Sequence, residues 1–262
     1  MLKRFDDLTI TDDFMFYHVM QNKDICLTLL NILLSDKVDR ITEIDFQRHV
    51  EHASYAKGIR LDILAKDESG NVYDIEMQTT DKNDLAKRMR YYQSAIDLSS
   101  LDKGCHYSEL VDSYIIFICK FDYLKAGLPV YSFKTRCSED NTIELKDGLS
   151  KIIVNAAAFS QTENKELRGF LEYIKTGEAT TEFTGRIANM ITIIKENEGA
   201  RQEYRLMSGF EMDVLYEGRQ KGIQEGRKEG KIEVARNFKL LGVDIAKIEQ
   251  ATGLSQKEIE AL

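Results

Sequence analysis

Apolar residues in the first fifty positions change from helical to alternating spacing. Thr11 or Asp12 is placed to cap a helix that runs to about Val19, and residues 24–34 have the spacing of a second helix. Residues 41–49, ITEIDFQRH, then alternate between apolar and polar side chains. A period of two is typical of a strand with one buried face. The pattern predicts two helices followed by a half-buried strand.

Two short apolar runs come next, separated by a turn signal. Residues 59–66, IRLDILAK, and residues 71–78, NVYDIEMQ, have the length and composition of strands. The residues DESG between them end in Gly70, which favours a tight turn. The two runs therefore predict an antiparallel hairpin.

The middle of the chain combines one helix with further strands. Residues 81–100 carry apolar side chains at helical spacing, at Leu85, Met89, Tyr92 and Ile96. Residues 113–122, SYIIFICKFD, form a continuous apolar run, which is typical of a strand buried on both faces. Residues 128–136 and 149–158 are further strand candidates. This order predicts a mixed α/β core in which the helix at 81–100 is a crossover between strands.

Only helical periodicity remains after about residue 160. The single proline is Pro129, so no proline interrupts this half of the chain. We therefore divide the sequence into an α/β core, residues 1–160, a helical extension, residues 161–217, and an all-α tail, residues 218–262.

The tail begins with a glycine every four residues. In EGRQKGIQEGRKEG these are Gly218, Gly222, Gly226 and Gly230. Each glycine costs a helix about 1 kcal/mol relative to alanine. Such a helix is either solvated and flexible or ordered by contact with another copy of the chain. Contact with nucleic acid is the third alternative.

The end of the chain predicts two short helices. Gly242 ends one helix and Asp244 begins the next, while Ser255 and Glu258 have the spacing of a capping box. Two helices joined by a tight glycine turn resemble a helix-turn-helix, although the last helix offers few side chains for reading bases. A plain helical hairpin is the alternative.

The composition is that of a globular protein and argues against a membrane-spanning or a secreted protein. Hydrophobic residues make up 43% of the 262 residues and charged residues 31%, which allows a substantial core. No apolar run approaches the roughly 20 residues of a membrane span, and the N-terminus is too polar for a signal peptide. We therefore expect a cytoplasmic protein without membrane contact.

The net charge and the positions of cysteine and histidine bear on nucleic-acid binding, disulfides and metal sites. The formal charge of −8 argues against a surface coated with positive charge, but it leaves room for local basic groups. The four cysteines are scattered and form no C-x-x-C pair, so we expect reduced thiols. His49 and His52 have no third metal ligand nearby in the sequence.

The predicted hairpin carries two carboxylates and an amide among apolar residues. Its turn centres near Ser69, so Asp62 on the first strand falls opposite Glu76 on the second. Side chains directly opposite each other have Cβ atoms about 5 Å apart. Gln78 lies two residues beyond Glu76 and so shares its face. Two carboxylates this close favour a divalent cation between them, and oxygen ligands select Mg²⁺ or Mn²⁺. A solvated strand face is the alternative.

Three segments, taken in order, resemble a known family. They are TDDFMF near the N-terminus, IRLDILAKDESGNVYDIEMQ at the hairpin and KRMRYYQSAI in the helix after it. With the glycine-rich C-terminal region, they resemble the Rpn family of recombination-promoting nucleases and transposases. This family lies within the PD-(D/E)XK nuclease superfamily, here in the variant with Gln in place of the motif's Lys. The resemblance covers most of the chain and implies a restriction-endonuclease-like core, a mixed central sheet flanked by helices.

The resemblance also implies catalytic roles. Asp62 and Glu76 would bind the metal, and Gln78 would stand where the superfamily has a catalytic lysine. Asp13 matches an acidic residue of the first helix that commonly assists in such folds. Arg88, on the helix after the motif, would face the site or a phosphate.

Gln78 cannot supply the positive charge that a lysine brings to a transition state. Arg88 is the better candidate for that charge, since Lys66 has the right strand parity but lies near the turn. We expect Tyr92, on the same helix as Arg88, to serve mainly in core packing.

The implied function is a metal-dependent DNA endonuclease associated with recombination or mobile elements. The alternative is a catalytically weak or inactive protein on the same fold that binds nucleic acid or oligomerises through its C-terminal helices. A ribonuclease-H-type transposase is disfavoured, because such sites draw their carboxylates from distant elements rather than from one hairpin.

Overall fold

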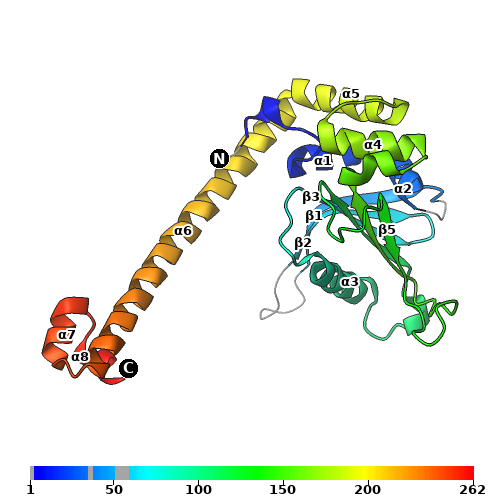
Figure 1. The fold of residues 1–262 in the computed structure, drawn as a ribbon. Coiled ribbons are helices and arrows are strands. Elements are labelled where there is room, and N and C mark those ends of the chain that lie inside the picture. The colour runs from blue at the N-terminus through cyan, green and yellow to red at the C-terminus, as the bar shows by residue number, and fades with distance from the viewer. Residues whose placement is uncertain (1–2, 35–37, 51–58) are drawn as a thin grey trace. The chain divides into compact units, whose positions relative to one another are not determined.

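A computed structural model gives the fold, and it describes residues 3–34, 38–50 and 59–262 (Figure 1). The described chain divides into two compact units, residues 3–200 and residues 201–262. The helices at 165–176 and 182–196 thus belong to the same unit as the sheet. The domain boundaries near residues 160 and 217 stay a prediction.

The first unit is built on a mixed sheet. Its six strands are β1 (Ile41–Val50), β2 (Ile59–Asp67), β3 (Val72–Gln78), β4 (Ser113–Cys119), β5 (Val130–Phe133) and β6 (Leu149–Asn155). Their order in the sheet is β1-β2-β3-β4-β6-β5. The first three strands are antiparallel neighbours, β3, β4 and β6 run parallel, and β5 is antiparallel to β6. The predicted strands are all confirmed.

Helices cover both faces of this sheet. They are α1 (Asp13–Met20), α2 (Lys23–Leu33), α3 (Leu85–Ser100), α4 (Lys165–Thr176) and α5 (Glu182–Glu196). Short 3-10 turns lie at Phe5–Asp7, Tyr107–Glu109 and Ala156–Gln161. Figure 1 shows α3 on one side of the sheet, with α1, α2, α4 and α5 on the other. The expected α/β core with flanking helices is confirmed.

Helix α3 connects β3 to the parallel strand β4, as expected for a crossover. Its residues Leu85, Met89 and Ile96 pack against Ile115 and Phe117 of β4 in one buried cluster. The stripe read from the sequence is therefore the face that α3 buries. Strand β4 is buried along most of its length, which explains its lack of alternation.

The expected helix cap at Asp12 makes different hydrogen bonds from those of an ordinary N-cap. Asp12 stands at the N-cap position of α1, but its side chain does not accept a hydrogen bond from that helix. Its carboxylate instead accepts from the backbone N–H of Thr9, at 2.8 Å, and from Lys3 Nζ, at 2.6 Å. Asp12 therefore fixes the segment that leads into α1.

Helices α4 and α5 approach each other closely at Gly169. A Cβ atom on Gly169 would overlap Cγ2 of Thr181, the residue that caps α5. We expect Gly169→Ala to lower the free energy of unfolding by about 1–3 kcal/mol, because the inserted methyl group forces the helices apart. Denaturant unfolding measures this.

Gly185 in α5 is the matched control. No described heavy atom lies within 4 Å of a Cβ built on it. Gly185→Ala should therefore raise the free energy of unfolding by up to about 1 kcal/mol through helix propensity alone. Equal effects at the two positions would contradict the close approach.

The second unit consists of helices. It comprises most of α6 (Glu198–Leu240), together with α7 (Ile245–Thr252) and α8 (Gln256–Glu260). Ala235, Ile248, Leu254 and Ile259 form a small core where these helices meet. The predicted stop at Gly242 is confirmed by its φ of 75°, and Gly253, with φ of 69°, ends α7 in the same way. The capping box at Ser255 and Glu258 is confirmed as well.

The four-residue glycine repeat lies inside α6. At Gly218, Gly222, Gly226 and Gly230, a Cβ atom would meet no described heavy atom within 4 Å. Within the described part of the chain, therefore, the repeat does not serve close helix packing. Contact with a second copy stays a prediction. None of the helices in the described part of the chain is both long and apolar enough to cross a membrane.

Candidate active site

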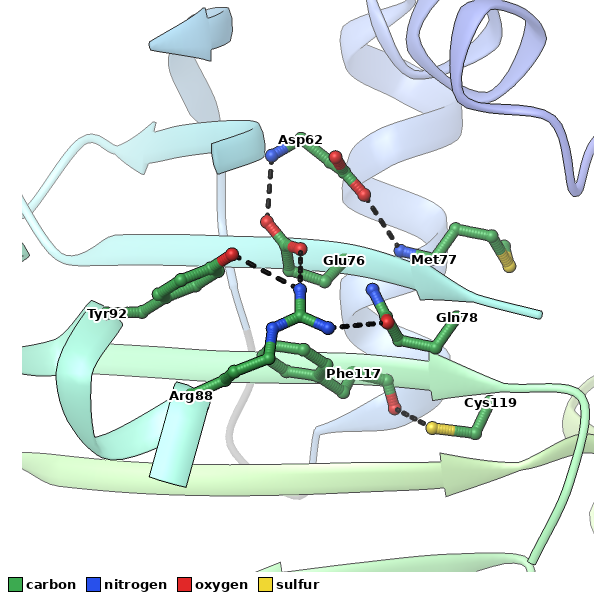
Figure 2. A network of polar contacts seen from close by, with 8 residues as sticks. All are labelled: Asp62, Glu76, Met77, Gln78, Arg88, Tyr92, Phe117 and Cys119. Carbon is green, nitrogen blue, oxygen red and sulfur yellow. Dashed lines mark hydrogen bonds and ion pairs between the residues drawn. The ribbon is translucent and has the colours of Figure 1, made fainter. Parts of the chain in front are cut away.

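The two carboxylates of the hairpin are held by the backbone of the opposite strand. The ladder between β2 and β3 pairs Leu64 with Asp74 and ends with Ile63 opposite Ile75. One step further, Glu76 Oε1 accepts a hydrogen bond from the backbone N–H of Asp62 at 2.8 Å (Figure 2).

Asp62 makes the reciprocal contact. Its Oδ2 accepts from the backbone N–H of Met77 at 3.2 Å. Where Asp62 lies opposite Glu76, the two strands are therefore joined by bonds from each carboxylate to the backbone of the other strand, beyond the end of the backbone ladder. The two carboxylates are fixed close to each other as a result.

Arg88 of α3 reaches back over the same face of β3. Its Nη1 donates to Gln78 Oε1 at 2.8 Å, and its Nη2 lies 3.4 Å from Glu76 Oε2 and 3.2 Å from the Tyr92 hydroxyl (Figure 2). The guanidinium also lies 5.4 Å and 5.2 Å from the ring centroids of Tyr92 and Phe117. These contacts hold a partly buried cation beside Glu76.

The sequence predicts that Tyr92 serves mainly in core packing, and the structure adds a polar contact to that role. Its ring does pack against the buried cluster beneath α3. Its hydroxyl, however, contacts Arg88 and faces the site, so packing is only part of its role.

A cavity of about 760 Å³ opens over these groups. Its lining includes all five side chains that the sequence suggests for the site: Asp13, Asp62, Glu76, Gln78 and Arg88. Lys82, Lys87 and Arg90 add positive charge to its wall. Lys66 is not among the described residues that line this cavity, and its Nζ lies 3.2 Å from Glu43 of β1. His52 and the side chain of His49 lie outside the described residues.

A comparison with protein families identifies the chain. The sequence model described as PD-(D/E)XK nuclease family transposase matches residues 11–215. The chain belongs to this family. Comparisons with curated proteins and with solved structures found no match. The matched range contains the hairpin, α3 and every residue of the candidate site.

Sequence reasoning missed one acidic residue beside the candidate site. Asp74 lies two residues before Glu76 on β3 and is fully buried. Apart from the neighbouring carboxyl of Glu76, neither of its carboxyl oxygens meets a hydrogen-bond partner among the described residues. The two-residue spacing, which places both side chains on one strand face, was the signal that could have found it.

The buried carboxyls have altered acidity. Burial raises the pKa of Asp74 well above its usual range, and the charge of Asp62 raises it further. Burial likewise raises the pKa of Glu76, followed by the charges of Asp74 and Asp62. Arg88 opposes both shifts. A hydrogen bond between Asp74 and Glu76 needs a proton on one of them, so the pair favours a shared proton when no cation is bound.

These shifts predict that the metal-free protein loses stability as the pH rises. The folded protein keeps protons that the unfolded chain releases near its ordinary carboxyl pKa of about 4. The stabilising contribution is therefore complete below that pH and is lost as the pH rises through the folded pKa values. Melting temperatures in a chelator, between about pH 5 and pH 9, measure this.

Glu76→Gln is the control variant for these melting temperatures. It removes one of the two buried carboxyls, so its melting temperature should fall less steeply as the pH rises. Saturating Mn²⁺ should also reverse the decline in the wild-type protein, because the cation favours the ionised carboxylates. Parallel curves for wild type and variant would contradict the assignment.

The donor set suits a hard divalent cation. Among the described residues, no three His, Cys, Asp or Glu side chains are grouped so as to hold a metal ion by themselves. Mg²⁺, however, is usually bound through one or two carboxylates, with waters and substrate phosphates completing its shell. Asp62 and Glu76 provide such a pair on the wall of a solvent-accessible cavity.

Proposed function

We propose that this protein is a metal-dependent DNA endonuclease that hydrolyses phosphodiester bonds in recombination or mobile-element processes. The observation that carries the proposal is the pairing of Asp62 and Glu76 beside the guanidinium of Arg88, at the wall of one cavity. Membership of the PD-(D/E)XK nuclease family transposases supports a nuclease-like function.

The proposed roles follow from the chemistry of each side chain. Asp62 and Glu76 hold Mg²⁺ or Mn²⁺ through carboxylate oxygens. When bound, the cation supplies Lewis acidity to a phosphate oxygen and acidifies a water molecule. Arg88 places positive charge where the phosphate becomes more negative in the transition state, in the role of the superfamily's lysine.

Gln78 and Asp13 complete the proposed site. Gln78 accepts from Arg88 through Oε1, which leaves its NH₂ group to orient a water or a phosphate oxygen. Asp13, at the first turn of α1, lines the same cavity and adds a carboxylate to it.

The wall of the cavity suits a polyanionic substrate. Its lining includes three basic side chains and one acidic one beside two hydroxyl groups: Lys82, Lys87, Arg90, Asp84, Thr79 and Thr80. Basic and hydroxyl side chains of this kind bind the phosphates of DNA without reading its sequence. The overall charge of −8 leaves this basic wall as a local feature of an acidic protein. We place the reaction in the cytoplasm, away from the membrane, with the C-terminal helices available for self-association.

Cleavage of supercoiled plasmid tests the proposal. The purified protein should convert plasmid to nicked and linear forms in Mg²⁺ or Mn²⁺, and EDTA should stop the conversion. Absence of cleavage with either cation, by a protein shown to be folded, would refute the endonuclease proposal.

The neutral Gln78 favours a second candidate function, a protein of this fold with weak or no activity that binds nucleic acid or self-associates. Calorimetric titration with Mn²⁺ separates the two. A folded protein that binds no Mn²⁺ but still binds DNA through residues 218–262 would support the second candidate.

A further inference from the structure

Tyr91 of α3 is 42% exposed and lines the cavity over the candidate site. The adjacent Tyr92 packs its ring against the buried cluster and contacts Arg88 through its hydroxyl. Burial of apolar area is the usual contribution of a tyrosine ring to stability, and it accounts for Tyr92 more fully than for Tyr91. A single exposed apolar side chain is ordinary on a protein surface, so what distinguishes Tyr91 is its position.

Tyr91 lies one helical turn from two basic residues of the same helix. Lys87 precedes it by four residues and Arg88 by three, and both line the same cavity. Side chains at these spacings are neighbours on a helix surface, with Cβ atoms about 5–6 Å apart. Arg88 in turn contacts Glu76 and Gln78. Tyr91 therefore stands beside the guanidinium that is proposed to meet the reacting phosphate, where a base attached to a bound phosphate can contact its ring.

An aromatic ring beside basic residues suits unpaired nucleotides better than a duplex. Lys87 and Arg90 can bind the phosphates of either form of DNA. An aromatic ring adds to this by stacking on the face of a base, as in grooves that bind single strands. In a duplex the neighbouring base pairs cover these faces, and only the base edges are open in the grooves. The ring of Tyr91 therefore favours a strand whose bases are unpaired.

We propose that Tyr91 stacks on an unpaired base and that the site selects single-stranded DNA over duplex DNA. The inference rests on the proposed function, because it takes the cavity as the place where DNA binds, but it does not require cleavage. Lys87, Arg88 and Arg90 hold the strand by its phosphates, and Tyr91 supplies the preference for unpaired bases. Because every base has an aromatic face, this preference is independent of sequence.

Two short strands of equal charge test the stacking contact. One is oligothymidine of about ten nucleotides, and the other is an abasic strand of the same length, which keeps the phosphates but has no bases. Fluorescence anisotropy in EDTA, with no cation to support cleavage, gives both affinities. The wild-type protein should bind oligothymidine about 5–100-fold more tightly than the abasic strand. Tyr91→Ala should lower this ratio to about 1, whereas Tyr91→Phe should keep it, because phenylalanine retains the ring.

Tyr107→Ala is the matched control. Tyr107 is an exposed tyrosine between α3 and β4, and it is not among the described residues that line the cavity, so its loss should leave the ratio unchanged. Equal wild-type affinities for the two strands, or no binding of either, would overturn the proposal. A Tyr91→Phe protein that loses as much as Tyr91→Ala would also overturn it, since the hydroxyl rather than the ring would then make the contact.

Cleavage in Mn²⁺ separates this inference from the endonuclease. At DNA concentrations below saturation, the wild-type protein should cleave a single strand faster than a duplex of the same length, and Tyr91→Ala should lose this preference. The expected affinities without cleavage of either form would refute only the endonuclease. Equal affinities for the oligothymidine and abasic strands, with cleavage of single-stranded and duplex DNA at equal rates, would refute only the role of Tyr91.

Discussion

Glu76→Gln should reduce cation-dependent DNA cleavage by more than about 100-fold. Substitution of groups that only support metal ligands already costs about 10–100-fold, so loss of a ligand costs more. Glu76 is 1% exposed and holds both the backbone N–H of Asp62 and the guanidinium of Arg88. Glutamine keeps the shape and one acceptor but carries no charge for the cation. Asp62→Asn should have an effect of the same order.

Plasmid cleavage rates in saturating Mn²⁺ measure these losses. The metal-free melting temperature should not fall for Glu76→Gln, because the variant removes repulsion between buried carboxyls. Glu43→Gln removes one acidic charge from an exposed position on the edge strand β1, so it is the charge control and should cleave at the wild-type rate. A Glu76→Gln protein that cleaves as fast as wild type would place the active site elsewhere.

Arg88→Gln should reduce the cleavage rate at saturating Mn²⁺ by about 100–1,000-fold. Loss of one preorganised group that stabilises transition-state charge has an effect of this size. Arg88 is the cation that contacts both Glu76 and Gln78. Arg88→Lys should recover only part of the loss, because a lysine keeps the charge but not the planar fork that reaches both partners.

Arg186→Gln is a control for Arg88. Arg186 is an exposed arginine on α5, on the other side of the sheet, so its loss should leave cleavage unchanged. The double variant Arg88→Gln/Gln78→Lys moves the positive charge to the position where the superfamily has a lysine. It should cleave faster than Arg88→Gln alone. Wild-type rates in Arg88→Gln would show that the cation alone provides the charge.

Much of this fold could be read from local patterns. The apolar stripe of α3, the buried run of β4 and the glycine stops near the C-terminus depend on residues close in sequence. Periodicity reports which face of an element is buried, and capping reports where a helix ends, so both are visible without the rest of the molecule. The hairpin register was readable too, since its turn sets which residues face each other.

The details of the site depend on contacts that spacing does not encode. Asp12 and Lys66 illustrate this, since each binds a partner that sequence spacing left open, Lys3 in one case and Glu43 in the other. A charged side chain has several partners within reach, and the choice among them depends on the packing of other elements.

The sequence alone determined the α/β core, the family and the candidate residues Asp62, Glu76 and Gln78, because strand parity and turn position place these side chains together. Tertiary structure decided the rest. It showed each carboxylate bound to the opposite backbone, the guanidinium of Arg88 between Glu76 and Gln78, and the buried carboxyl of Asp74. The physical reason is burial. Only when α3 packs over the sheet do these charges lose water and depend on one another.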